Sequence, residues 1–75
     1  MNIEELKNHL QINLKGVIYE IEAKFKHKEN TQVGFTIETM HPISSHSILS
    51  FCEDFTFMAI GEARYYITFT TKLLD

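Results

Sequence analysis

The chain has 75 residues, of which 44% are hydrophobic and 12% aromatic, and its formal net charge is −3 at pH 7. This length allows one small domain, residues 1–75, with a modest core, because ordering costs of roughly 1.5 kcal/mol per residue nearly offset apolar burial at this size. The mild negative charge argues against a general polyanion binder. No apolar run approaches the ~20 residues that span a bilayer.

Cys52 is the only cysteine, so an internal disulfide is excluded. A single free thiol is typical of a reducing compartment, and the sequence begins without a charged-then-apolar leader for export. We therefore expect a cytoplasmic protein without a membrane segment. Small domains often depend on a metal, a disulfide or self-association for stability, and we expect self-association here, most simply as a homodimer.

Residues 2–15 have the pattern of an amphipathic helix that leads directly into a strand. Asn2 followed by Glu5 is a candidate capping box, and Gly16 is a natural helix stop. A helix this short is marginal alone in water and needs a surface to pack on. The apolar residues of its narrow stripe are Ile3, Leu6, Leu10 and Leu14.

Residues 17–40 have the pattern of one long β-hairpin. Apolar and polar residues alternate along both arms, which is typical of strands with one buried and one solvated face. The expected loop is Lys28-Glu29-Asn30, because Asn tolerates the left-handed conformation that the last position of a three-residue loop requires. This register places Ile21 opposite Ile37. The predicted buried residues are Val17, Tyr19, Ile21, Ala23 and Phe25 on the first arm and Val33, Phe35 and Ile37 on the second.

Residues 41–47, which include Pro42, predict a loop. The next stretch, 47–60, fits both a helix and a strand template, since short apolar runs cannot be separated by periodicity alone. We expect a short turn or helix at 45–53 and a strand at 54–60.

The last segment has a clearer pattern. Gly61-Glu62-Ala63 predicts a turn, although its length leaves the register of this hairpin open. Residues 64–73 alternate as a strand. One predicted face carries Tyr65, Ile67, Phe69 and Thr71, and the other carries Tyr66, Thr68, Thr70 and Lys72.

These elements predict an α+β fold. An N-terminal amphipathic helix packs on a four-stranded antiparallel sheet built from two β-hairpins, with a second short helix at 45–53. One short helix is too small to cover both faces of such a sheet. Exposed edges and a half-apolar second face favour pairing with another chain. The apolar residues expected on the second face are Ile18, Met40, Met58, Ile60 and Tyr66.

The leading functional prediction is a small non-enzymatic protein-binding module, of the adaptor or stoichiometric-inhibitor type, which acts through a strand edge and an acidic and apolar sheet face. A three-residue loop places Glu20 opposite Glu38, and a register slipped by two places Glu22 there instead. Either arrangement gathers three carboxylates, and Met58 and Tyr66 supply apolar anchors. A solvated face on which nearby lysines balance these glutamates would show the same pattern.

The hairpin tip supports an alternative function. Lys24, Lys26 and Lys28, together with a tyrosine on a sheet face, have the residue types that hold single-stranded nucleic acid, with phosphates on lysines and bases on aromatic rings. The glutamates nearby count against a nucleic-acid partner, and lysines at a hairpin tip also protect a strand edge.

A second alternative is a metal-binding protein that uses His41, His46 and Cys52. Imidazole and thiolate are good zinc ligands, but four firm ligands are not evident in this spacing. Loop histidines near an isolated cysteine would show the same pattern. A Cys52–His46 nucleophile pair with Asp54 as its orienting group matches by residue type only. We therefore expect no cofactor and no catalytic site.

Overall fold

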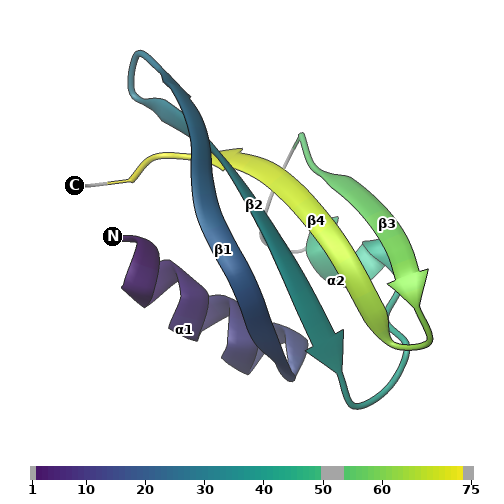
Figure 1. The fold of residues 1–75 in the computed structure, drawn as a ribbon. Helices are drawn as coiled ribbons and strands as arrows, with labels where there is room; N and C mark the ends of the chain where they lie inside the picture. The colour runs from purple at the N-terminus through teal and green to yellow at the C-terminus, as the bar shows by residue number, and fades with distance from the viewer. Residues whose placement is uncertain (1, 50–53, 74–75) are drawn as a thin grey trace.

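The computed structural model describes residues 2–49 and 54–73, and it confirms the predicted α+β fold. The strands pair antiparallel in the order β1-β2-β4-β3, so that the two hairpins join through β2 and β4 at the centre of the sheet. The described elements (Figure 1) are α1 (Ile3–Leu14), β1 (Gly16–His27), β2 (Asn30–Thr39), α2 (Ser45–Leu49), β3 (Thr56–Gly61) and β4 (Arg64–Thr71).

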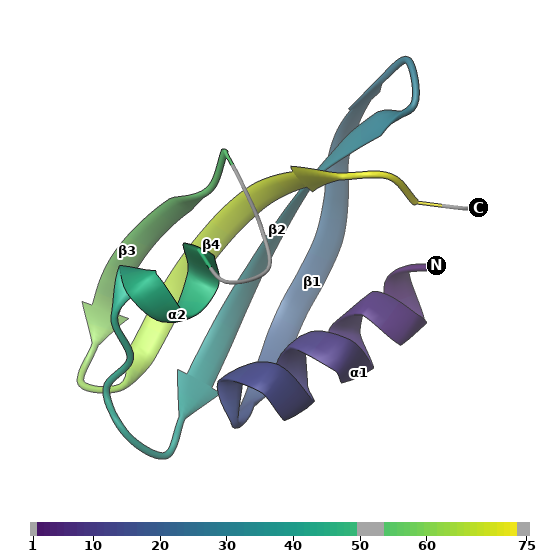
Figure 2. The same cartoon turned by 180° about the vertical axis from the view of Figure 1, so that it is seen from behind.

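Both helices lie on the same face of the sheet (Figure 2). α1 crosses the β1 side of this face and α2 crosses the β3–β4 side, so the core forms between the helices and the sheet. Aromatic pairs fill much of it, because Phe35 and Phe69 meet edge to face at 6.2 Å and Phe57 stacks on Tyr65 at 5.0 Å. The buried apolar residues are Leu6, Leu10, Leu14, Ile18, Val33, Phe35, Ile37, Ile48, Tyr65, Ile67 and Phe69.

The predicted N-terminal cap of α1 is confirmed, whereas its predicted stop is displaced by one residue. The Asn2 side-chain oxygen accepts a hydrogen bond from the Glu5 backbone N–H at 2.9 Å. The left-handed residue that ends the helix is Lys15, with φ 55°, and Gly16 already belongs to β1. Gly16 is needed for a different reason, since a Cβ there would lie 2.6 Å from the Glu38 carbonyl oxygen.

The first hairpin closes through two residues rather than the predicted three. His27 pairs with Asn30, and Lys28 takes the left-handed conformation with φ 57°. The predicted loop was wrong because Lys28, not Asn30, adopts the special backbone angle. As a result Lys26 lies opposite Thr31.

β1 also contains two bulges, one between Tyr19 and Glu22 and one between Ala23 and Phe25. In the first of them Glu20 has φ 53°. Each extra residue reverses the alternation of side chains between the two faces of a strand.

The bulges overturn the predicted buried face at both ends of β1, whereas Ile21 in the middle of the strand packs against the core as predicted. The prediction assumed an unbroken period of two, which holds only without an inserted residue. Ile18 is 4% exposed and pairs with Ile37 in the core, although it was assigned to the second face. Val17, Tyr19 and Phe25 were predicted to be buried, but they are 52%, 48% and 62% exposed.

The second half of the chain follows the prediction more closely. β3 matches the strand expected at 54–60, and α2 confirms the helical reading of residues 45–49, while residues 50–53 lie outside the described ranges. Gly61 pairs with Arg64, so the turn consists of Glu62 and Ala63. The core face of β4 is the predicted one, with Tyr65, Ile67 and Phe69 buried.

In residues 2–49 and 54–73, none of the helices has the length and apolarity that crossing a membrane requires.

Replacing Gly16 with alanine should lower the free energy of unfolding by roughly 1–3 kcal/mol, the usual cost of overpacking a closed site. The new Cβ would collide with a backbone oxygen that cannot move alone. Urea denaturation measures this loss. Gly34→Ala is the matched control, because the three atoms nearest to a Cβ at Gly34 belong to the side chains of Tyr66 and Lys24, which can rotate away, and not to the backbone. Equal losses at the two glycines would contradict the close approach at Gly16.

Candidate functional site: the uncovered face of the sheet

The face of the sheet opposite the two helices is left uncovered by the described elements (Figure 1). We call it the outer face. The register places two short rows across it, from β1 through β2 and β4 to β3. One row consists of Val17, Glu38, Arg64 and Gly61, and the next consists of Tyr19, Thr36, Tyr66 and Met58.

The outer face is rich in apolar side chains. Single exposed apolar residues are ordinary on protein surfaces, whereas several on one face mark a contact surface. An open depression of about 430 Å³ lies between Tyr19 of β1 and Ile60 of β3, with Thr36 and Arg64 also lining it. The large apolar side chains of this face, each 48–62% exposed, are Val17, Tyr19, Phe25, Met58 and Ile60.

Tyr66 lies at the centre of the outer face because β2 has a glycine there. A Cβ on Gly34 would lie 2.6 Å from the Tyr66 hydroxyl, so the glycine makes room for the phenol. The Lys24 ammonium lies 5.4 Å from the centre of the Tyr66 ring, which is a cation–π contact. The Tyr66 hydroxyl, as a hydrogen-bond partner, also raises the pKa of Lys24 above its usual value.

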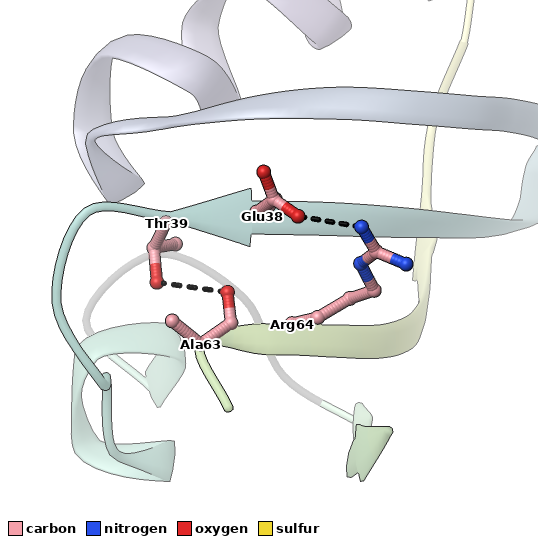
Figure 3. A network of polar contacts seen from close by, with 4 residues as sticks. All are labelled: Glu38, Thr39, Ala63 and Arg64. Atoms are coloured by element: carbon pink, nitrogen blue, oxygen red, sulfur yellow. Dashed lines mark hydrogen bonds and ion pairs between the residues drawn. The ribbon is translucent and has the colours of Figure 1, made fainter. Parts of the chain in front are cut away.

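An ion pair borders the outer face where β2 ends. The Arg64 guanidinium donates to the Glu38 carboxylate at 2.6 Å, and both side chains are about half exposed (Figure 3). This carboxylate raises the pKa of Arg64 through its hydrogen bond and its charge. Beside the pair, the Thr39 N–H donates to the Ala63 carbonyl at 2.8 Å, which ties β2 to the turn before β4.

The structure separates the predicted acidic residues. Glu38 lies opposite Val17 and Glu22 lies opposite Gly34, so the two glutamates are offset along the strands by four residues, which is about 13 Å at 3.3 Å per residue. Glu20 sits in the first bulge and lines the depression described above. Both predicted registers, with Glu20 or Glu22 opposite Glu38, are therefore wrong, because neither included the short turn and the bulges. A role for these carboxylates in binding a protein stays a prediction.

The apolar members of the predicted site lie where they were expected. Met58 and Tyr66 occupy adjacent strands of one row, with Met58 60% exposed and Tyr66 half-buried. Sequence reasoning missed Val17 and Tyr19 on the same face. The sequence does contain an indication of their exposure. The apolar run Val17-Ile18-Tyr19 places apolar side chains on both faces of the strand in any register.

The lysines of the hairpin tip do not form a single cluster. Lys24 lies over Tyr66 on the outer face. Lys26 pairs with the buried Thr31 and so belongs to the opposite face by register, and Lys28 lies in the turn. A phosphate chain would meet these charges from different sides.

The candidate metal ligands are placed only in part. His41 and His46 are exposed, in the loop after β2 and in α2, and Cys52 lies outside the described residues. Within residues 2–49 and 54–73, no group of three or more His, Cys, Asp or Glu side chains is arranged to hold a metal ion.

No protein-family model matches this chain. Comparisons with curated proteins and with solved structures give no match either.

Replacing Tyr66 with phenylalanine should return the pKa of Lys24 toward its ordinary value, because the hydroxyl is the main cause of the increase. A raised folded-state pKa stabilises the fold below the unfolded pKa, and this contribution is lost as the pH rises through the folded pKa. NMR titration of the lysine side-chain carbons measures the shift. Tyr19→Phe is the control, and an unchanged Lys24 pKa in Tyr66→Phe would contradict the assignment.

Proposed function

We propose that this protein is a small non-enzymatic binding module that docks on another protein through its outer face. A single observation carries the proposal: both helices cover one face of the sheet, and the other face presents exposed apolar and aromatic side chains on β1 and β3. An adaptor and a stoichiometric inhibitor would both use such a surface. A cytoplasmic location, expected from the single cysteine, belongs to the same proposal.

The chemistry of the outer face suits a protein partner. Contact surfaces between proteins combine aromatic and methionine anchors with a polar, charged rim. Tyr19 and Met58 are the anchors here, and the pair formed by Glu38 and Arg64 supplies a rim with both signs of charge. The partner expected is a protein with an apolar protrusion that enters the depression between Tyr19 and Ile60.

The exposed glutamates add a preference to this proposal. Glu20 borders the depression and Glu22 lies further along β1, and neither forms an ion pair among those seen in the described residues. Basic side chains around the partner's protrusion would pair with them. Such rim charges affect association rate and selectivity more than affinity.

Tyr19→Ser and Val17→Ser should each weaken partner binding by about tenfold or more, which is about 1.4 kcal/mol. Both side chains are about half exposed, so the fold should persist. A photoreactive residue at position 19 first identifies the partner by crosslinking, and calorimetry then measures the affinity of each variant.

The matched control is Ile12, which is 76% exposed on α1, away from the outer face. Ile12→Ser should bind the partner as the wild type does, and a photoreactive residue at position 12 should not capture it. Equal capture from both positions, or an unchanged affinity in Tyr19→Ser, would remove the outer face from the proposal.

One observation favours nucleic-acid binding as a second candidate function. Phe25 is 62% exposed on β1 next to Lys24, which gives an aromatic ring with a basic neighbour near the hairpin tip, while Lys26 belongs to the other face by register. The Tyr66 ring supports this reading less, because the Lys24 ammonium already lies over it.

If this second function operates, a single-stranded RNA oligonucleotide should bind at low salt and bind much more weakly as the salt concentration rises. Exchanging Lys24, Lys26 and Lys28 for glutamine should then abolish binding. Fluorescence anisotropy measures both effects. Absence of binding at 20 mM salt (about a 20 Å screening length) would eliminate this candidate.

A further inference from the structure

We infer that β3 pairs with β3 of a second copy of this chain, so that two four-stranded sheets join into one eight-stranded antiparallel sheet. The inference goes beyond the proposed function, because it concerns a strand edge rather than the outer face. β3 is the last strand of the sheet, and β4 is its one hydrogen-bonded neighbour among the described residues.

The opposite edge, formed by β1, is guarded against pairing. The Ile18 backbone N–H donates to the Gln11 side-chain oxygen at 2.9 Å, so a residue of α1 already occupies this edge donor. The two bulges in β1 interrupt a regular ladder, and Lys24 and Lys26 add charge to the strand. Bulges, lysines and covering side chains are the devices by which proteins prevent contact between strand edges.

β3 has one irregularity, a register shift between Ala59 and Gly61 at its end, and none of the other devices. Thr56–Gly61 contains no charged residue and no proline, and its pairing with β4 runs without a shift from Thr56 to Ala59. Ala59 and Gly61 are exposed, and because these residues have little or no side chain, much of that exposed surface is backbone. Backbone donors and acceptors at an open edge are a template for another strand.

A second copy fits this edge better than an unrelated strand, because β3 complements itself. In an antiparallel pairing about a two-fold axis through Met58, each Met58 lies opposite its equivalent. Phe57, which is half-buried, then lies opposite the small Ala59 of the second copy, so a large side chain meets a small one on the core face. Thr56 lies opposite Ile60, the residue within the register shift at the end of β3.

The difference between the two edges also limits the assembly to two copies. A β3-to-β1 contact would repeat from copy to copy and form an open fibre. A β3-to-β3 contact instead occupies the β3 edge of each copy, so the assembly ends at two chains. The guarded β1 edge leaves only the closed arrangement. A contact of one short strand buries less than a standard interface of about 1,600 Å², so we expect a dissociation constant on the order of 10 µM.

Analytical ultracentrifugation of the full chain tests the pairing. At 200 µM, well above the expected dissociation constant of about 10 µM, the wild type should sediment at twice its 8.8 kDa mass. Met58→Lys and Met58→Glu should each be monomeric, because like charges would face each other at the two-fold axis. An equimolar mixture of the two variants should restore the dimer. Met58 is 60% exposed, so both variants should keep the fold, which circular dichroism checks.

Tyr19→Lys is the matched control. Tyr19 and Met58 lie at opposite ends of the same row across the outer face, Tyr19 on β1 and Met58 on β3. Edge pairing leaves this variant dimeric, whereas a dimer formed by stacked outer faces would dissociate. Hydrogen exchange of the wild type gives an independent reading, because β3 amides should exchange more slowly as the protein concentration rises and β1 amides should not.

A wild type that stays monomeric at 200 µM, a dimeric Met58→Lys, or a monomeric Tyr19→Lys would each overturn the inference. A monomer that still binds its partner through Tyr19 would overturn the β3 pairing alone. A dimer whose Tyr19→Ser variant keeps full affinity for the partner would overturn the proposed function alone.

Discussion

The arrangement of the whole structure depends on which face of the sheet its two helices cover. A four-stranded sheet has two faces, and α1 and α2 both lie on the same one. On that side, Phe35 of β2 and Ile67 of β4 lie opposite each other on the two central strands, and both are almost fully buried. Among residues 2–49 and 54–73, no helix lies on the other face. The apolar residues of this outer face are the observation on which the proposed function rests.

The elements themselves could be predicted from the sequence, because helix caps and hydrophobic periodicity are local. Asn2 and Glu5 indicate where α1 begins, and the alternation through Tyr65 and Ile67 indicates β4. The faces of β1 could not be predicted, because a bulge depends on long-range pairing with β2. A period-two pattern stays readable only while no residue is inserted, and Glu20 occupies such an insertion.

The same bulges decided how well the candidate site could be predicted. Met58 and Tyr66 were placed correctly, because the alternation of β4 is unbroken and Met58 pairs directly with Tyr66. Val17 and Tyr19 were assigned to the core, although they enlarge the open apolar surface. The error concealed part of the feature on which the functional prediction rested, so the outer face is more apolar than the sequence indicated.

The bulges in β1 also connect the open face with the open edge. They twist and interrupt the β1 edge of the sheet, whereas β3 pairs regularly from Thr56 to Ala59 and shifts only at its end, between Ala59 and Gly61. Further strands would therefore add at the β3 edge. Pairing through β3 would place two outer faces side by side on one continuous sheet. A partner with two equivalent protrusions would then bind both faces with an avidity that neither face has alone. If β3 pairs in this way, the difference between the two edges would let a small surface bind strongly without a larger domain.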